Sequence, residues 1–114
     1  MTLTEVLANC KTNAPKGFAL LNEKGPEGWL AKVDLDDFTI GRASRCVLGY
    51  AYGSYHFGMK ELFNLTEEMT ATWDDHAEGH GFDATGGPQR FDRIAELDAD
   101  WRAIITAARE EAAS

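Results

Sequence analysis

The sequence of 114 residues is poor in cysteine, in proline and in long hydrophobic runs. Its two cysteines, Cys10 and Cys46, can form one disulfide at most. The longest apolar runs, such as residues 18–21, have about four residues, whereas a membrane-spanning helix needs roughly 18. The first residues also lack the basic and apolar regions of a signal peptide. We therefore expect a cytoplasmic protein with two free thiols and no membrane partner.

Basic residues are also scarce, since 11 Lys and Arg stand against 19 Asp and Glu, for a net charge of −8. Direct nucleic-acid binding rests on Lys and Arg that neutralise phosphates, so this class of function is excluded. Neither a phosphate-binding glycine loop nor a serine nucleophile elbow occurs. The sequence therefore predicts no cofactor and no catalytic residue, and it favours a non-enzymatic function.

The sequence does contain enough apolar material for a core, with 44% hydrophobic residues that include 12 aromatic ones. Apolar residues recur mostly at helical spacing. We predict a mainly α, single domain over residues 1–114, with four or five helices and a long C-terminal helix of about 25 residues from Pro88. A minor β-hairpin that pairs residues 18–21 with 35–40 is the alternative for part of the chain.

Capping signals predict the helix boundaries. Thr2 and Glu5 have the spacing of a capping box at the start of the first helix. Pro15 and Gly17 are expected to end that helix. Ser44 is the expected N-cap of a later helix.

An acidic segment carries most of the net charge. Residues 66–85 contain six acidic residues and no Lys or Arg. Thr66 is the expected N-cap of a helix there, which Gly79 should end. The acidic side chains, of which Glu67, Glu68, Asp74 and Asp75 are the candidates, could dock a basic protein. They could also mimic nucleic-acid charge, or form an ordinary solvated helix face.

The same segment contains His76 and His80, four residues apart and therefore on one face of a helix. Imidazole nitrogens together with carboxylates suit zinc or another transition metal. Two surface histidines at a helix end are the alternative, because histidine there complements the helix dipole.

Cys46 is a candidate reactive thiol. If Ser44 is the N-cap, Cys46 lies in the first turn of its helix, beside Arg42 and Arg45. A helix N-terminus and nearby cations both favour the thiolate. The alternative is a buried core cysteine, which is common for this residue type.

An aromatic stretch is the second candidate for partner binding, because aromatic side chains are enriched at interaction hot spots. Its alternative is a cluster of core side chains. Independently, the long C-terminal helix could form a homodimer. The candidate partner-binding residues of the stretch are Tyr50, Tyr52, Tyr55 and Phe57.

Two motifs carry a resemblance to a known group of proteins. Residues 44–55 read Ser-Arg-Cys-Val-Leu-Gly-Tyr-Ala-Tyr-Gly-Ser-Tyr, and residues 80–84 read His-Gly-Phe-Asp-Ala, with Trp101 further along. Over residues 28–105 the sequence resembles small uncharacterised proteins of actinobacteria and their bacteriophages. The resemblance implies no activity. It does suggest an accessory or regulatory protein of phage or host that engages another protein.

Overall fold

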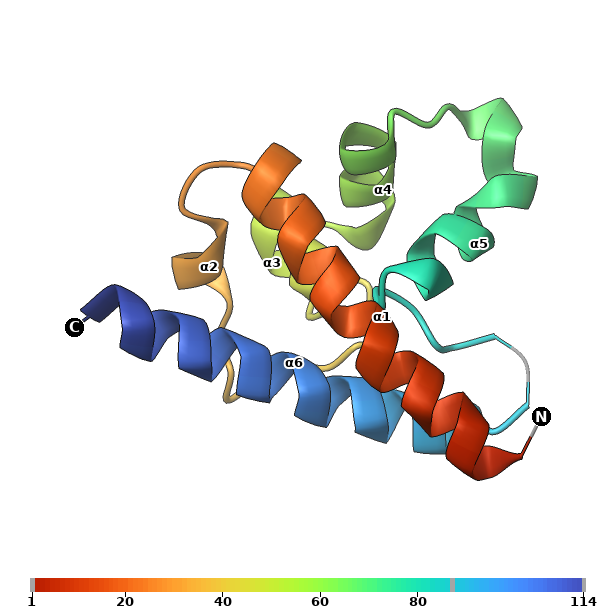
Figure 1. Cartoon of the computed structure of the whole chain (residues 1–114). Coiled ribbons are helices and arrows are strands. Elements are labelled where there is room, and N and C mark those ends of the chain that lie inside the picture. The colour runs from red at the N-terminus through yellow and green to blue at the C-terminus, as the bar shows by residue number, and fades with distance from the viewer. Residues whose placement is uncertain (1, 87, 114) are drawn as a thin grey trace.

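The computed structural model describes residues 2–86 and 88–113, and every regular element among them is a helix (Figure 1). The mainly α prediction is confirmed, including the long C-terminal helix. Six α-helices are present within this part of the chain rather than four or five. The elements are α1 (Leu3–Lys24), α2 (Trp29–Lys32), α3 (Val47–Tyr52), α4 (Tyr55–Phe63), the 3-10 turn η1 (Glu67–Met69), α5 (Thr70–Gly79) and α6 (Arg90–Ala113).

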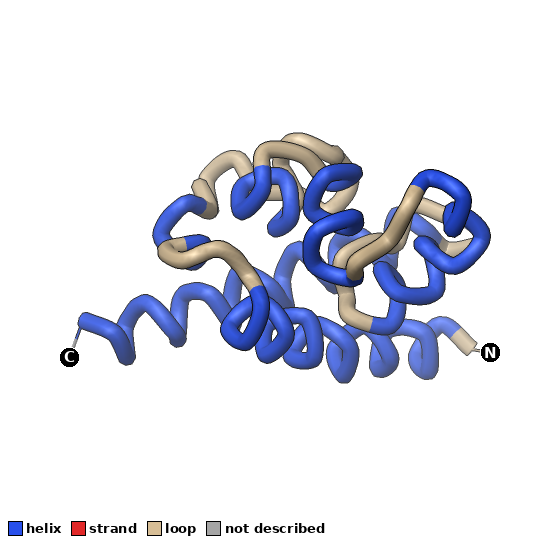
Figure 2. The backbone as a smooth tube through the Cα atoms, turned by 90° about the horizontal axis from the view of Figure 1, so that it is seen from above, coloured by secondary structure: helices blue, strands red, loops and turns tan. Residues whose placement is uncertain are grey.

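The two long helices, α1 and α6, lie against each other, and the short helices cover one side of them (Figures 1 and 2). Helix α6 has 24 residues, which correspond to ~36 Å at 1.5 Å per residue. The longest dimension of the molecule is 40 Å, so α6 runs along almost the whole domain. No helix of the described part is long and apolar enough to cross a membrane.

Helix α1 does not end at Pro15 and Gly17 as predicted, but continues to Lys24. Proline lacks the N–H that would bond the carbonyl four residues earlier, which weakens a helix interior. Here the core-facing residues of the helix before and after Pro15 are buried, with Ala14 fully buried and Leu21 at 1% exposure. Packing of this face against the core therefore outweighs the local preference.

The alternative prediction of a β-hairpin, which also involves part of α1, is wrong. Residues 18–21 belong to α1, and residues 35–40 form turns rather than a strand. A short apolar run does not distinguish a strand from a buried helix segment.

The core is centred on Trp101 of α6, which is fully buried. Its ring stacks on that of Phe82 with 5.7 Å between centroids. Its indole N–H donates to the Gly81 carbonyl at 2.7 Å. Gly81 has a φ of 70°, a conformation that glycine adopts without strain. The turn after α5 is thereby fixed to the middle of α6.

The long connection between α2 and α3 is held by polar side chains of α6. Arg102 and Arg109 donate to its backbone carbonyls, Arg109 also donates to the Leu30 carbonyl in α2, and Asp98 accepts hydrogen bonds from the connection. These contacts satisfy backbone groups that no regular secondary structure pairs. Their partners are Leu30, Val33, Leu35, Phe38, Thr39 and Ile40.

The middle helices begin later than the capping signals predict. Cys46, rather than Ser44, is the N-cap of α3. Thr66 precedes the turn η1, and α5 starts only at Thr70. Gly53 separates α3 from α4 with a left-handed φ of 96°. The predicted end of α5 at Gly79 is confirmed.

Candidate functional site

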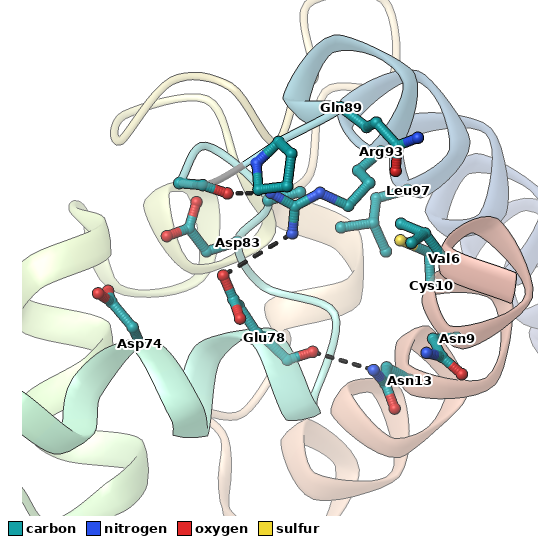
Figure 3. A pocket seen from close by; sticks show the side chains of 13 residues that line it. Val6, Asn9, Cys10, Asn13, Asp74, Glu78, Asp83, Gln89, Arg93 and Leu97 are labelled. Carbon is teal, nitrogen blue, oxygen red and sulfur yellow. Dashed lines mark hydrogen bonds and ion pairs between the residues drawn. The ribbon is translucent and has the colours of Figure 1, made fainter. Parts of the chain in front are cut away.

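A pocket of about 530 Å³ lies between α1, the end of α5, the connection that follows it and the start of α6 (Figure 3). Helix α1 supplies one face of four residues at the spacing i, i+3, i+4 and i+7, and α6 supplies residues from its first two turns. The lining residues are Val6, Asn9, Cys10, Asn13, Asp74, Glu78, Asp83, Ala84, Gly86, Pro88, Gln89, Arg93 and Leu97.

The pocket has a charged side and an apolar side. Figure 3 shows Asp74, Glu78 and Asp83 on one side and Val6, Cys10 and Leu97 on the other, with Arg93 between them. Three carboxylates face one guanidinium, so the ionised lining has a net charge of −2.

Arg93 is largely occupied by contacts within the protein. Its side chain is only 14% exposed, and one of its amino groups lies 3.8 Å from a Glu78 carboxylate oxygen. The other amino group donates to the Gly86 carbonyl. Asn13 in turn donates to the Glu78 backbone carbonyl at 3.2 Å. Arg93 therefore ties the end of α5 to the connection, and its ion pair is with Glu78 rather than with Asp74 or Asp83.

Among the residues that the structure describes, Asp74 and Asp83 have no basic partner. Of the ion pairs within residues 2–86 and 88–113, none involves either carboxylate. Asp83 accepts hydrogen bonds from the backbone N–H and the hydroxyl of Thr85 at 2.9 and 2.7 Å. Both contacts use the same carboxylate oxygen, and the other oxygen takes part in neither of them.

The negative charge affects Glu78. Partial burial raises the pKa of its carboxyl group above the ordinary value, and the nearby carboxylates of Asp83, Asp74 and Asp75 raise it further. The guanidinium of Arg93 opposes this shift. An additional cation in the pocket would favour the ionised form of Glu78.

Cys10 forms part of the apolar wall. Burial raises the pKa of its thiol, although the Arg93 charge acts in the opposite direction. The thiol is therefore protonated at neutral pH, and Cys10 contributes an apolar surface rather than a nucleophile.

The four acidic candidates from the sequence have different environments. The Glu67 carboxylate lies 3.0 Å from both His56 Nε2 and Lys60 Nζ, and hydrogen bonds from these groups lower its pKa. Glu68 and Asp75 are exposed and take part in no ion pair of the described residues. Asp74 lines the pocket.

The two histidines of the metal hypothesis pack around an aromatic ring. His76 and His80 lie 5.1 and 5.0 Å from the Phe63 centroid. His80 Nδ1 lies 2.9 Å from the His76 carbonyl oxygen, within hydrogen-bond distance. Over the residues that the structure describes, no three His, Cys, Asp or Glu side chains are grouped so that they could hold a metal ion.

Cys46 is buried, at 1% exposure. Its sulfur accepts a hydrogen bond from the Gly49 N–H at 3.3 Å and so caps α3. Burial raises the pKa of the thiol to about 11, which outweighs the hydrogen bonds that favour the thiolate. The reactive-thiol hypothesis expected a lowered pKa, so this environment speaks against it.

The aromatic stretch is divided between core and surface. Tyr52 and Tyr55 are half-buried and pack on the core. Tyr50 donates its hydroxyl hydrogen to Asp37 at 3.1 Å. Only Phe57, at 49% exposure, presents a large apolar surface to solvent. Most of the predicted hot spot is therefore part of the fold.

The sequence analysis did not identify the pocket. Two of its α1 residues, Val6 and Cys10, belong to the apolar face of that helix, and Arg93 has no distinguishing motif. The polar residues Asn9 and Asn13 beside this face were the signal in the sequence that could have indicated the pocket.

Comparisons with family models, with curated proteins and with solved structures find no match.

Proposed function

We propose that this chain is a protein-interaction module that binds a basic partner through the acidic surface of η1, α5 and the connection after α5. The proposal rests on acidic side chains that form no ion pair within the described part of the protein. Asp74, Asp75 and Asp83 take part in no ion pair of the described residues. Carboxylates that form no internal ion pair keep their charge available for an external cation.

Such a surface acts mainly on the rate and the selectivity of association. A cluster of like charges steers a partner of the opposite sign and repels partners of the same sign. Salt should weaken this attraction, because the Debye length falls to about 8 Å at physiological ionic strength. The proposal assigns Glu67 an internal role, since its carboxylate is already bound by His56 and Lys60.

The proposed function is consistent with the expected cytoplasmic location. Both cysteines are free, which suits a reducing cytoplasm. The resemblance to actinobacterial and phage proteins suggests an accessory or regulatory protein of phage or host. The metal and thiol alternatives have less support, since burial raises the pKa of Cys46 and the described histidines lack further ligands.

The test is a pull-down from an actinobacterial lysate with charge-reversed protein. The variant Glu68→Lys/Asp75→Lys changes two exposed acids of the segment that lie outside the pocket. The control Glu23→Lys/Glu27→Lys makes the same change of charge at two exposed acids elsewhere. We expect the control to recover the same partner as the unmodified chain, and the first variant to recover much less. Equal recovery by both variants contradicts the proposal.

A further inference from the structure

We propose that the pocket between α1, α5 and α6 receives one arginine or lysine side chain of the basic partner. This inference rests on the proposed function and adds to it a defined recognition site. It commits to a long side chain with a cationic end and an aliphatic stem, carried on a polypeptide.

The charge of the lining requires a cation. Arg93 is engaged by Glu78 and by the Gly86 carbonyl, which leaves Asp74 and Asp83 as unpaired carboxylates. An anionic ligand would meet net repulsion from these groups. A neutral ligand would leave them without a counter-charge in a partly enclosed site. A guanidinium or ammonium group supplies the positive charge that both carboxylates lack, and it can donate to the Asp83 oxygen that Thr85 does not contact.

The opposite wall fits the stem of such a side chain. Val6, Cys10, Ala84 and Leu97 line this apolar wall, and the half-buried Val6 is the most exposed of them. Lysine and arginine bury their methylene groups along apolar surfaces while the charged end stays near polar groups. The pocket therefore offers the two kinds of surface that one such side chain presents.

The size of the pocket is also suitable. Its volume of about 530 Å³ lies within the roughly 300–1,000 Å³ that is usual for small-ligand sites. A metal ion would be far too small to fill it, and no metal-binding group exists among the described residues. One extended side chain with part of its own backbone fits this space.

Glu78 provides an independent way to detect a cation bound in the pocket. Its pKa is raised by burial and by the neighbouring carboxylates, and a bound cation would lower it again. Binding should therefore release a proton and become weaker as the pH falls through the raised pKa of Glu78.

The experiment titrates a tetra-arginine peptide and the matching tetra-citrulline peptide into the full chain, with binding followed by amide chemical shifts in NMR. Citrulline keeps the shape of arginine and removes its charge. We expect arginine to shift the amides of Asn9, Cys10 and Asn13, and citrulline to leave them in place. N-acetyl-arginine amide, titrated to millimolar concentration, should shift the same amides if one side chain is sufficient.

Two sets of variants separate the pocket from the surface. Asp74→Asn/Asp83→Asn should weaken binding of the arginine peptide about tenfold, whereas Asp75→Asn outside the pocket should weaken it less than twofold. Asparagine at position 83 retains an oxygen acceptor for Thr85, so the local fold is kept. Val6→Phe narrows the pocket without changing its charge and should also weaken binding.

The outcomes are distinct for the two proposals. Equal loss from Asp75→Asn and Asp74→Asn/Asp83→Asn means that the peptide binds the surface alone, which overturns the pocket and leaves the interaction module standing. Shifts that are the same for citrulline and arginine also overturn it. Loss of the lysate partner in the pocket variants as well as in Glu68→Lys/Asp75→Lys supports both proposals. Unchanged recovery with every variant contradicts both.

Discussion

Replacement of Gly17 by alanine should destabilise the protein, although alanine is the better helix former. Gly17 lies inside α1, where alanine normally stabilises by about 1 kcal/mol relative to glycine. A Cβ atom at this position would lie 2.1 Å from the His80 carbonyl oxygen and 3.0 Å from the rings of Phe82 and Trp101. The nearest of these atoms belongs to the backbone, so no side-chain rotation can relieve the contact.

The expected loss of stability is the steric cost of the added Cβ atom minus the gain in helix propensity. Overpacking a well-packed core costs about 1–3 kcal/mol, and a backbone contact at 2.1 Å belongs at the upper end. After subtraction of the helix-propensity gain, we expect a net loss of about 2 kcal/mol. For a domain of this size such a loss lowers the Tm by about 8 °C.

Gly79 provides the matched control. It is also helical, in the last turn of α5, and an added Cβ there meets nothing within 4 Å. Gly79→Ala should therefore leave the stability unchanged or raise it by up to about 1 kcal/mol. Urea unfolding followed by tryptophan fluorescence measures both variants. A Gly17→Ala protein that is as stable as the unmodified chain would show that α1 does not approach residue 80 so closely.

Three further predictions concern other buried or paired groups. Because the pKa of the Cys46 thiol is about 11, iodoacetamide at neutral pH should label it far more slowly in the folded protein than in urea; equal rates would contradict its burial. The folded pKa of Glu67 is lowered by His56 and Lys60, so its stabilisation is present above the ordinary pKa and is lost as the pH falls through the folded value. Glu67→Gln should therefore flatten the stability profile below the ordinary glutamate pKa of 4.5, and an unchanged profile would be inconsistent with the pairing. Arg109→Lys should cost about 1.5–3 kcal/mol in urea unfolding, because lysine cannot span the Leu30 and Val33 carbonyls as the guanidinium does; no loss would mean that water replaces these bonds.

The helical class was predictable because apolar residues at helical spacing were frequent and strand patterns were few. The course of α1 was not, since Pro15 and Gly17 are strong local signals for a helix end. The outcome there depends on burial of Ala14 and Leu21 and on the close approach of residue 80. Such contacts between distant segments leave no trace in a local pattern.

The candidate site was predictable only in part. The sequence located the acidic segment, but it could not indicate that Glu67 is paired internally while Asp74 faces a pocket. That difference depends on which residues of α4 and α1 lie opposite each acid. The thiol of Cys46 shows the same limit, because its raised pKa results from burial that a helix N-terminus in the sequence does not predict.

The hydrogen bonds from α6 to the connection between α2 and α3 have a consequence for the way in which the domain opens. Arg102, Arg109 and Asp98 provide polar contacts for a segment without regular secondary structure. Any fluctuation that detaches α6 therefore also exposes the backbone of this segment to water. The connection and the C-terminal helix should exchange their amide hydrogens as one cooperative unit, although the residues that they pair lie at least 58 positions apart in the sequence.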